Sequence, residues 1–110
     1  MGATKTDHYA DNQNEIAMLA KALGHPARVA IVEYLVETNE CVCGKIVETL
    51  PLAQPTVSQH LKELKNVGII KGEVEGNSVC YCIDKETITK MSHYFSMLLN
   101  KLETSNNSNG

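Results

Sequence analysis

Apolar residues recur at helical spacing along most of the first half of the chain. The first apolar stripe falls in residues 11–24 and predicts a helix that stops at Gly24. A second helix is predicted over residues 25–37, with Pro26 near its first position, where a proline is tolerated. The apolar positions of these two helices are Ile16, Leu19, Ala20, Leu23, Val32, Leu35 and Val36. A short third helix is predicted over residues 44–50.

The segment from residue 52 to residue 70 combines an apolar stripe with a polar outer face. Val57, Leu61 and Leu64 lie at positions i, i+4 and i+7, so we expect them to share one buried face of a helix. Gly68 suits the position just after the end of this helix. The remaining surface is mostly polar and includes Thr56, Ser58, Gln59, Lys62 and Lys65.

The periodicity changes to alternation over residues 69–83, which predicts a β-hairpin with its turn at Gly76–Asn77. Asp84 then caps a last helix that is expected to end at Glu103. The apolar stripe of this helix consists of Ile88, Met91, Phe95, Leu98, Leu99 and Leu102. The predicted fold is mainly α with a β-hairpin wing, a winged helix-turn-helix in the order α-α-α-α-β-β-α.

Length and composition indicate one globular domain, since the chain has 110 residues of which 43% are hydrophobic and 21% charged. We expect a disordered arm over residues 1–10, the domain over residues 11–103 and a disordered tail over residues 104–110. The apolar runs are far shorter than the roughly 20 residues of a membrane span. No signal peptide opens the chain, so we expect a cytoplasmic protein without a membrane partner, whose four cysteines are thiols and not a disulfide framework.

Charge alone leaves nucleic-acid binding open. The net charge is −3, but residues 45–72 carry four lysines against two glutamates and form a basic region. A helix that enters the major groove of DNA needs short hydrogen-bonding side chains near its N-terminus, and cationic groups that reach phosphate. A polar helix face by itself could simply be solvated, but the short helix before it and the hairpin after it favour DNA reading. The predicted DNA-binding residues are Gln54, Thr56, Ser58, Gln59, His60, Lys62 and Lys65.

Two stretches carry a resemblance to a known family. The sequence AQPTVSQHLKELKNVGIIKGEVEGNSVCYCI, residues 53–83, resembles the recognition helix and wing of the ArsR/SmtB family of winged-helix repressors. The sequence LAKALGHPARVAIVEYL, residues 19–35, is similar to the opening helix pair of that family, including Pro26 and Arg28. The resemblance covers about residues 15–102 and implies a homodimer that binds a palindromic double-stranded operator and is released by an inducer.

The resemblance also implies that the first and last helices join the two protomers, and the apolar stripe of the last helix independently calls for a partner surface. The predicted dimer interface consists of Leu19, Leu23, Ile88, Met91, Phe95, Leu98 and Leu102. The chain departs from the family pattern at Ala53, where the family often has serine. It departs again at the wing, where Glu73, Glu75 and Asn77 stand in place of arginine, so a contact between wing and phosphate is not expected from the sequence.

The cysteines fall in two Cys-x-Cys pairs. ECVCG, residues 40–44, looks like the Cys-Val-Cys of arsenic- and cadmium-responsive members of the family, but Ile46 stands where the arsenic type has a third cysteine. Arsenite is held by three sulfurs in such members, and soft thiolates suit thiophilic ions. The resemblance therefore implies an inducer such as arsenite, antimonite or a soft divalent metal, and no cofactor required for folding.

The fold suggests where the missing ligand comes from. If residues 40–43 pair as a strand with residues 78–83, the two cysteines of each pair share one face of the sheet. Opposite residues of an antiparallel pair lie about 4.5–5.5 Å apart, whereas residues i and i+2 of one strand lie roughly 6.5–7 Å apart, too far for a disulfide within either pair. The predicted ligand set is Cys41, Cys43, Cys80 and Cys82, of which three would bind one ion.

Other interpretations of the cysteines stay open. A thiol-oxidation sensor would use a cross-strand disulfide, and simple core packing would use no chemistry at all. A zinc site on the last helix is rejected, since Asp84 is followed by Glu86 and His93 stands alone. An enzyme is also rejected, because the chain has no Cys-x-x-Cys, phosphate loop or paired nucleophile and base. A winged-helix module that never touches DNA is disfavoured by the polar face of residues 54–62.

Overall fold

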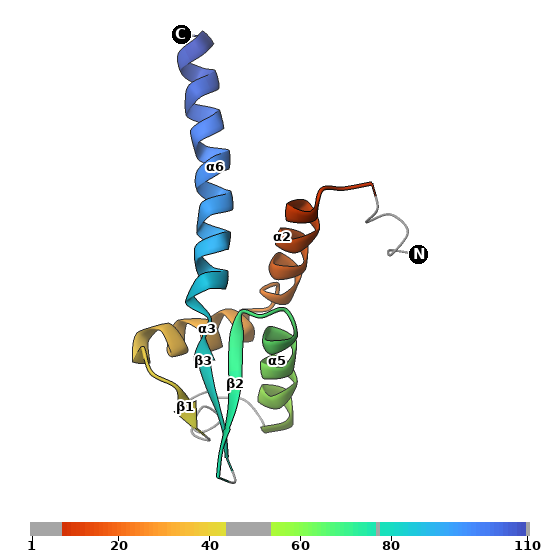
Figure 1. Ribbon diagram of the computed structural model, residues 1–110, viewed down its shortest axis with the longest axis vertical. Coiled ribbons are helices and arrows are strands. Elements are labelled where there is room, and N and C mark those ends of the chain that lie inside the picture. Colours follow the sequence, from red (N-terminus) through yellow and green to blue (C-terminus); the bar gives the residue numbers. More distant parts are fainter. Residues whose placement is uncertain (1–7, 44–53, 77, 110) are drawn as a thin grey trace.

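The computed structural model describes the backbone of residues 8–43, 54–76 and 78–109. Its elements are α2 (Asp11–Ala22), α3 (Pro26–Thr38), β1 (Val42–Cys43), α5 (Gln54–Asn66), β2 (Ile70–Glu75), β3 (Ser78–Ile83) and α6 (Lys85–Asn109). Within these ranges the predicted order of helices, hairpin and last helix is confirmed. The short helix expected over residues 44–50 and most of the arm expected over residues 1–10 lie outside the described ranges. α6 projects from the rest of the molecule as one long helix (Figure 1).

The described strands form one antiparallel sheet in the order β1-β3-β2. Glu75 pairs with Ser78, so the chain reverses between these two residues, where the alternation predicts the turn. Gly76 has a φ of 60°, which is the left-handed conformation that such a turn requires and that glycine adopts without a steric penalty. The central position of β3 brings the segment before residue 44 against the wing, which is the pairing expected from the sequence.

The core lies between α2, α3, α5 and the hairpin. The stripe predicted on α5 is confirmed, since Val57, Leu61 and Leu64 are each at most 4% exposed. The buried apolar residues are Leu19, Ala22, Ile31, Leu35, Val57, Leu61, Leu64, Ile69, Ile70 and Cys80. On α3 the buried pair is Ile31 and Leu35, four residues apart, whereas Val36, also on the apolar stripe, is 52% exposed.

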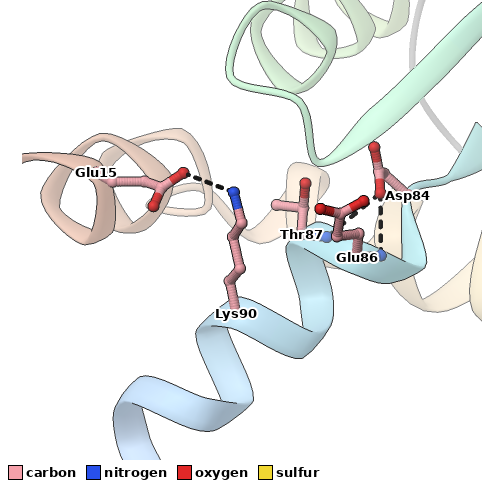
Figure 2. Close-up of polar contacts among 5 residues, drawn as sticks. All are labelled: Glu15, Asp84, Glu86, Thr87 and Lys90. Carbon is pink, nitrogen blue, oxygen red and sulfur yellow. Dashed lines mark hydrogen bonds and ion pairs between the residues drawn. The ribbon is translucent and has the colours of Figure 1, made fainter. Parts of the chain in front are cut away.

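Helix ends are set by local hydrogen bonds. His25 caps α3, because its Nδ1 accepts the amide hydrogen of Ala27 at 3.0 Å. Asp84 caps α6 as predicted, since its Oδ1 accepts from the amides of Glu86 at 3.0 Å and Thr87 at 3.3 Å (Figure 2). The helix then runs to Asn109, beyond the end at Glu103 and into the tail that the sequence was expected to leave disordered. No glycine or proline interrupts residues 85–109, so no residue there breaks a helix. Within the described ranges, no helix is both long and apolar enough to span a membrane.

Gly68 ends α5 and starts the wing. Its φ is 83°, its amide donates to Lys65 O at 3.0 Å, and the amide of Ile69 donates to Leu64 O at 3.1 Å. These two bonds make a Schellman motif, and the buried Ile69 and Leu64 supply the apolar contact that usually accompanies it. The turn therefore sets the angle between the exposed face of α5 and β2.

Replacing Gly68 by alanine should destabilise the fold through backbone conformation alone. A Cβ there would meet only Thr87 Oγ1, at an ordinary 3.8 Å, so no clash adds to the cost. We expect Gly68→Ala to lower the free energy of unfolding by about 1–2 kcal/mol, measured as a lower urea midpoint at unchanged slope. Gly68→Asn, which tolerates the left-handed region better, should lose about half as much. Equal stability of all three proteins would contradict this account.

Candidate nucleic-acid interface and cysteine site

The polar face predicted on α5 is exposed. Thr56, Ser58, Gln59, Lys62 and Lys65 all lie at the surface, on the side of the helix away from its buried apolar stripe. Gln54 begins the helix, but its side chain lies outside the described part of the chain. The structure thus brings hydroxyl, amide and ammonium groups onto one solvent-facing surface beside the wing.

His60 does not belong to this surface, and its prediction as a DNA contact is corrected by its burial. The side chain is only 7% exposed. Its Nδ1 accepts a hydrogen bond from Arg28 Nε at 3.0 Å, and its ring centroid lies 4.5 Å from that of His25. Burial, followed by the positive charges of His25 and Arg28, lowers the pKa of His60 below its usual value. The sequence held a signal for this, because His60 lies three residues after Val57 and four before Leu64 and so shares their face.

Lys65 lies where the helix meets the wing. A Cβ added to Gly72 of β2 would stand 3.3 Å from both Lys65 Cε and Nζ, so the lysine side chain crosses the strand at that glycine. Beyond this point the wing carries the exposed Glu73 and an opposed pair of valines, Val74 at 76% exposure and Val79 at 40%.

The two Cys-x-Cys segments face each other across β1 and β3. Cys43 pairs directly with Cys80, and the same register places Cys41 opposite Cys82. Cys41 and Cys82 form a disulfide, with their Cα atoms 4.4 Å apart, and Cys80 is also disulfide-bonded. The predicted cross-strand geometry is therefore confirmed, whereas the expectation of free thiols is wrong for these three residues. Strand pairing is the physical reason, because opposite Cα atoms fall at the separation a disulfide requires.

A cavity of about 300 Å³ adjoins the Cys41–Cys82 pair. Its walls come from the end of α3, the segment between α3 and β1, the end of β3 and the first turn of α6. The lining residues are Leu35, Val36, Asn39, Glu40, Cys41, Cys82, Ile83, Lys85 and Ile88. The sulfur pair is therefore in direct contact with the space at the base of the long helix.

The metal-ligand set proposed from the sequence is neither assembled nor contradicted in this oxidised form. Among the described residues, no group of three or more histidine, cysteine, aspartate or glutamate side chains is placed to hold a metal ion. A disulfide sulfur carries no thiolate charge, and the side chain of Cys43 lies outside the described part of the chain. The soft donors would become available on reduction, and their chemistry fits a thiophilic ion.

The residues predicted at the dimer interface divide into two groups. Leu19 is 2% exposed within the core, so its assignment to the interface is corrected, and Leu23, Ile88 and Met91 are half-buried against that core. The outer part of α6 differs, since its apolar residues are largely exposed. They are Phe95 at 56%, Leu98 at 39%, Leu99 at 56% and Leu102 at 62%. An ion pair of 3.3 Å between Lys90 and Glu15 joins the base of α6 to α2 (Figure 2).

Comparisons with known proteins agree with this geometry. A family model described as "Bacterial regulatory protein, arsR family" matches residues 25–71. The chain is 48% identical over 63 residues to the HTH-type transcriptional repressor SmtB of Mycobacterium tuberculosis, which covers 57% of this chain and 46% of that protein, so the match spans about half of that relative's length. It is 35% identical over 88 residues to the cadmium resistance transcriptional regulatory protein CadC homolog of Staphylococcus aureus, covering 79% of this chain and 72% of the relative.

A solved structure supports the fold. The ArsR-like transcriptional regulator from Rhodococcus sp. RHA1 superposes with a TM-score of 0.78 over 90% of this chain and 92% of that one, at 17% sequence identity. At that identity the likeness concerns the fold alone, and it confirms the mainly helical winged architecture.

The strand register makes a test of the sulfur pairing possible. The double variant Cys43→Ala/Cys80→Ala leaves Cys41 and Cys82 directly opposite, so it should form an intramolecular disulfide on air oxidation. The matched variant Cys43→Ala/Cys82→Ala leaves two cysteines on the diagonal, about 7–8 Å apart and beyond disulfide reach. Thiol counting and peptide mass spectrometry under non-reducing conditions should find a link in the first variant and free thiols in the second. Equal oxidation of both variants would show that this register is not maintained.

Proposed function

The chain belongs to the ArsR family of bacterial regulatory proteins, and from that premise we propose that it is a DNA-binding transcriptional repressor. We propose further that a thiophilic ion, of the arsenite, antimonite or soft divalent class, releases it from its operator by binding cysteine thiolates of β1 and β3. The observation that carries the sensing part is the antiparallel register that sets the cysteines of the two strands opposite one another. The relatives are named as regulators and repressors, so no catalytic role enters the proposal.

The DNA-reading part rests on the exposed face of α5. In this proposal Thr56, Ser58 and Gln59 reach base edges in the major groove, because their short hydroxyl and amide groups can both donate and accept. Lys62 and Lys65 supply charge to phosphates, which positions the helix without reading sequence. Gln54 remains a proposed contact at the N-terminus of the helix, where base edges come close.

Dimerisation supplies the second half-site. α6 projects from the body (Figure 1), and its exposed apolar side chains are Phe95, Leu98, Leu99 and Leu102. Packing this surface against its copy would remove it from water and relate two α5 helices by a twofold axis. Such a dimer reads two half-sites about one helical turn of DNA, roughly 34 Å, apart.

Ion sensing requires the reduced protein. Reduction would free the sulfurs of Cys41 and Cys82, whose Cα atoms are 4.4 Å apart, and that of Cys80 next to them on β3. Thiolates drawn from two neighbouring strands can converge on one soft ion, although either Cys-x-Cys alone supplies only two. The relative named for cadmium resistance supports this class of inducer.

The cavity beside the sulfurs suggests how the signal reaches the dimer. Lys85 and Ile88, from the first turn of α6, line the same space as Cys41 and Cys82. An ion that draws the two strands into a new sulfur arrangement would alter this packing and hence the angle at which α6 leaves the body. A 10- to 100-fold loss of operator affinity needs a coupling of only about 1.4–2.8 kcal/mol.

The disulfide itself favours a second candidate, a repressor that senses thiol oxidation. In that scheme the Cys82 thiolate attacks a peroxide, the O–O bond breaks, and a sulfenic acid and water form. The Cys41 thiolate then attacks the sulfenic sulfur, hydroxide leaves and takes a proton as a second water, and the disulfide is complete. Two thiols thus lose two electrons, and one peroxide is reduced to two waters.

Two substitutions on α5 test the division between base and phosphate contacts. The operator is first obtained by selecting bound sequences from random duplexes. Gln59→Ala should weaken operator binding by about 1–3 kcal/mol and leave non-specific affinity nearly unchanged. Lys62→Ala should weaken both and reduce the slope of log K against log salt by about one.

The control for these substitutions is Lys101→Ala, which removes an exposed lysine of α6. This helix projects away from the part of the molecule that holds α5 (Figure 1). It should leave both operator affinity and salt slope unchanged. Wild-type behaviour of both α5 variants would remove DNA reading by this face from the proposal.

The two sensing schemes separate in one variant. Reduced Cys43→Ala/Cys80→Ala keeps only the sulfur pair of Cys41 and Cys82, so it can form a disulfide but cannot provide three thiolates. For an ion sensor, arsenite or cadmium should release wild-type protein from operator DNA, and the variant should need at least about tenfold more ion. For an oxidation sensor, peroxide should release both proteins alike, and dithiothreitol should restore binding. Operator binding by the wild type that neither ions nor peroxide alter would defeat both schemes.

A further inference from the structure

A hydrogen-bonded cluster lies where α2, α3 and α5 meet, away from the exposed reading face and from the sulfurs. It consists of His25, Arg28 and His60. Arg28 Nη1 donates to the backbone carbonyl of Ala22, the last residue of α2, at 3.1 Å, and its Nε donates to His60 Nδ1 at 3.0 Å. One guanidinium therefore bridges the end of α2 and the inner side of α5.

His25 completes the cluster. Its Nδ1 caps α3 through the amide of Ala27, and its ring packs on that of His60 at 4.5 Å between centroids, tilted by 48°. His60 is thus held in the interior by a directional hydrogen bond on one atom and a ring contact on its face. Apolar packing of Val57, Leu61 and Leu64 keeps α5 on the core, but such packing is not directional. The bond to Arg28 adds a directional constraint on the rotation of α5 about its own axis.

We propose that Arg28 and His60 are positioning residues for DNA recognition, and that their hydrogen bond aims the exposed face of α5 only while the His60 imidazole is neutral. The inference rests on the proposed DNA-binding function. It assigns to both residues an indirect role in DNA binding. His60 is buried, and Arg28 is half-buried and donates hydrogen bonds to Ala22 and His60.

The requirement for neutral imidazole follows from the geometry. Arg28 can only donate, so His60 Nδ1 must offer its lone pair and the ring proton must sit on Nε2. Protonation of Nδ1 would remove the acceptor and set two cations face to face in a buried place. The titratable and charged groups around this point are His25 and Arg28 on α3 and, lining a cavity with Arg28, Lys21 of α2 and Glu63 of α5.

The pH dependence has a definite sign. Because burial and the neighbouring positive charges lower the pKa of His60, the unfolded chain takes up this proton at a higher pH than the folded protein does. The stability tied to neutral His60 is complete above about pH 6.5 and declines as the pH falls from there toward the lowered pKa. The aim of the α5 face depends on the folded protein alone, so it should be lost at lower pH, as the pH falls through the lowered pKa of His60.

The direction in which operator affinity changes with pH distinguishes this cluster from surface histidines. Protonation of surface histidines adds positive charge to the protein, which strengthens binding to DNA as pH falls. A repressor that binds operator more weakly in acid, while still folded, is therefore the expected signature of the buried pair.

The test compares operator affinity of wild type, His60→Asn and His60→Leu between about pH 8 and about pH 5, with circular dichroism at each pH to confirm folding. Asparagine places Oδ1 where His60 has Nδ1, so it accepts from Arg28 but cannot be protonated. We expect wild-type affinity to fall at least about threefold toward acid. His60→Asn should stay within about twofold of wild type at high pH and lose the acid effect. His60→Leu should bind at least about fivefold more weakly at every pH, because Arg28 loses its partner.

A wild type that binds equally well or more tightly in acid would overturn the inference, as would an acid effect that persists in His60→Asn. If His60→Leu lost thermal stability but bound operator like wild type, the cluster would be structural only and the positioning role would be wrong. Absence of operator binding by the wild type at any pH would instead overturn the proposed function, and the positioning role with it.

Discussion

The pairing of β1 with β3 is the constraint on which the cysteine site depends. Side chains alternate along a strand, so the register that sets Cys43 against Cys80 also sets Cys41 against Cys82 on the same face. A slip of one residue would place Val42 opposite a cysteine and send the sulfurs to opposite faces. Since β1 has only two residues, its register is determined by β3, which the hairpin holds in the sheet centre through six pairs with β2. The hairpin therefore holds the strand against which the cysteines of the preceding segment are aligned.

α5 has two structural requirements to meet at once. α5 must bury one face firmly and present the opposite face at a fixed angle, and apolar contacts alone satisfy only the first demand. The Gly68 turn fixes the angle between α5 and β2. The Arg28–His60 hydrogen bond adds a directional constraint between α3 and α5. A buried histidine in a reading unit costs desolvation, which is offset only while it accepts from Arg28. Specificity of orientation is a physical reason to retain it.

Much of the fold could be predicted from local signals, as the α5 stripe, the Asp84 cap, the two-residue turn and the cross-strand cysteines show. Predictions failed where tertiary contacts decide. Leu19 was assigned to a partner surface, yet α2 packs it into the core, and His60 was grouped with polar neighbours although its helical position is internal. The end of α6 was set too early because polar composition was given more weight than the absence of any helix-breaking residue. The expectation of free thiols rests on the expected compartment, whereas the disulfide follows from the short distance between the paired strands.

α3 connects the two proposed centres. Its first turn carries Arg28 in the cluster with His60, and its last turn lends Leu35 and Val36 to the cavity beside Cys41 and Cys82. At 13 residues it spans roughly 20 Å, and it packs against both α5 and β3. A change in sulfur geometry that tilts α3 would displace the Arg28 guanidinium relative to His60, whose hydrogen bond tolerates little misalignment. In the proposed repressor, the sensing chemistry thus reaches the DNA-reading helix by two routes, through the base of α6 to the dimer and through α3 within a single protomer.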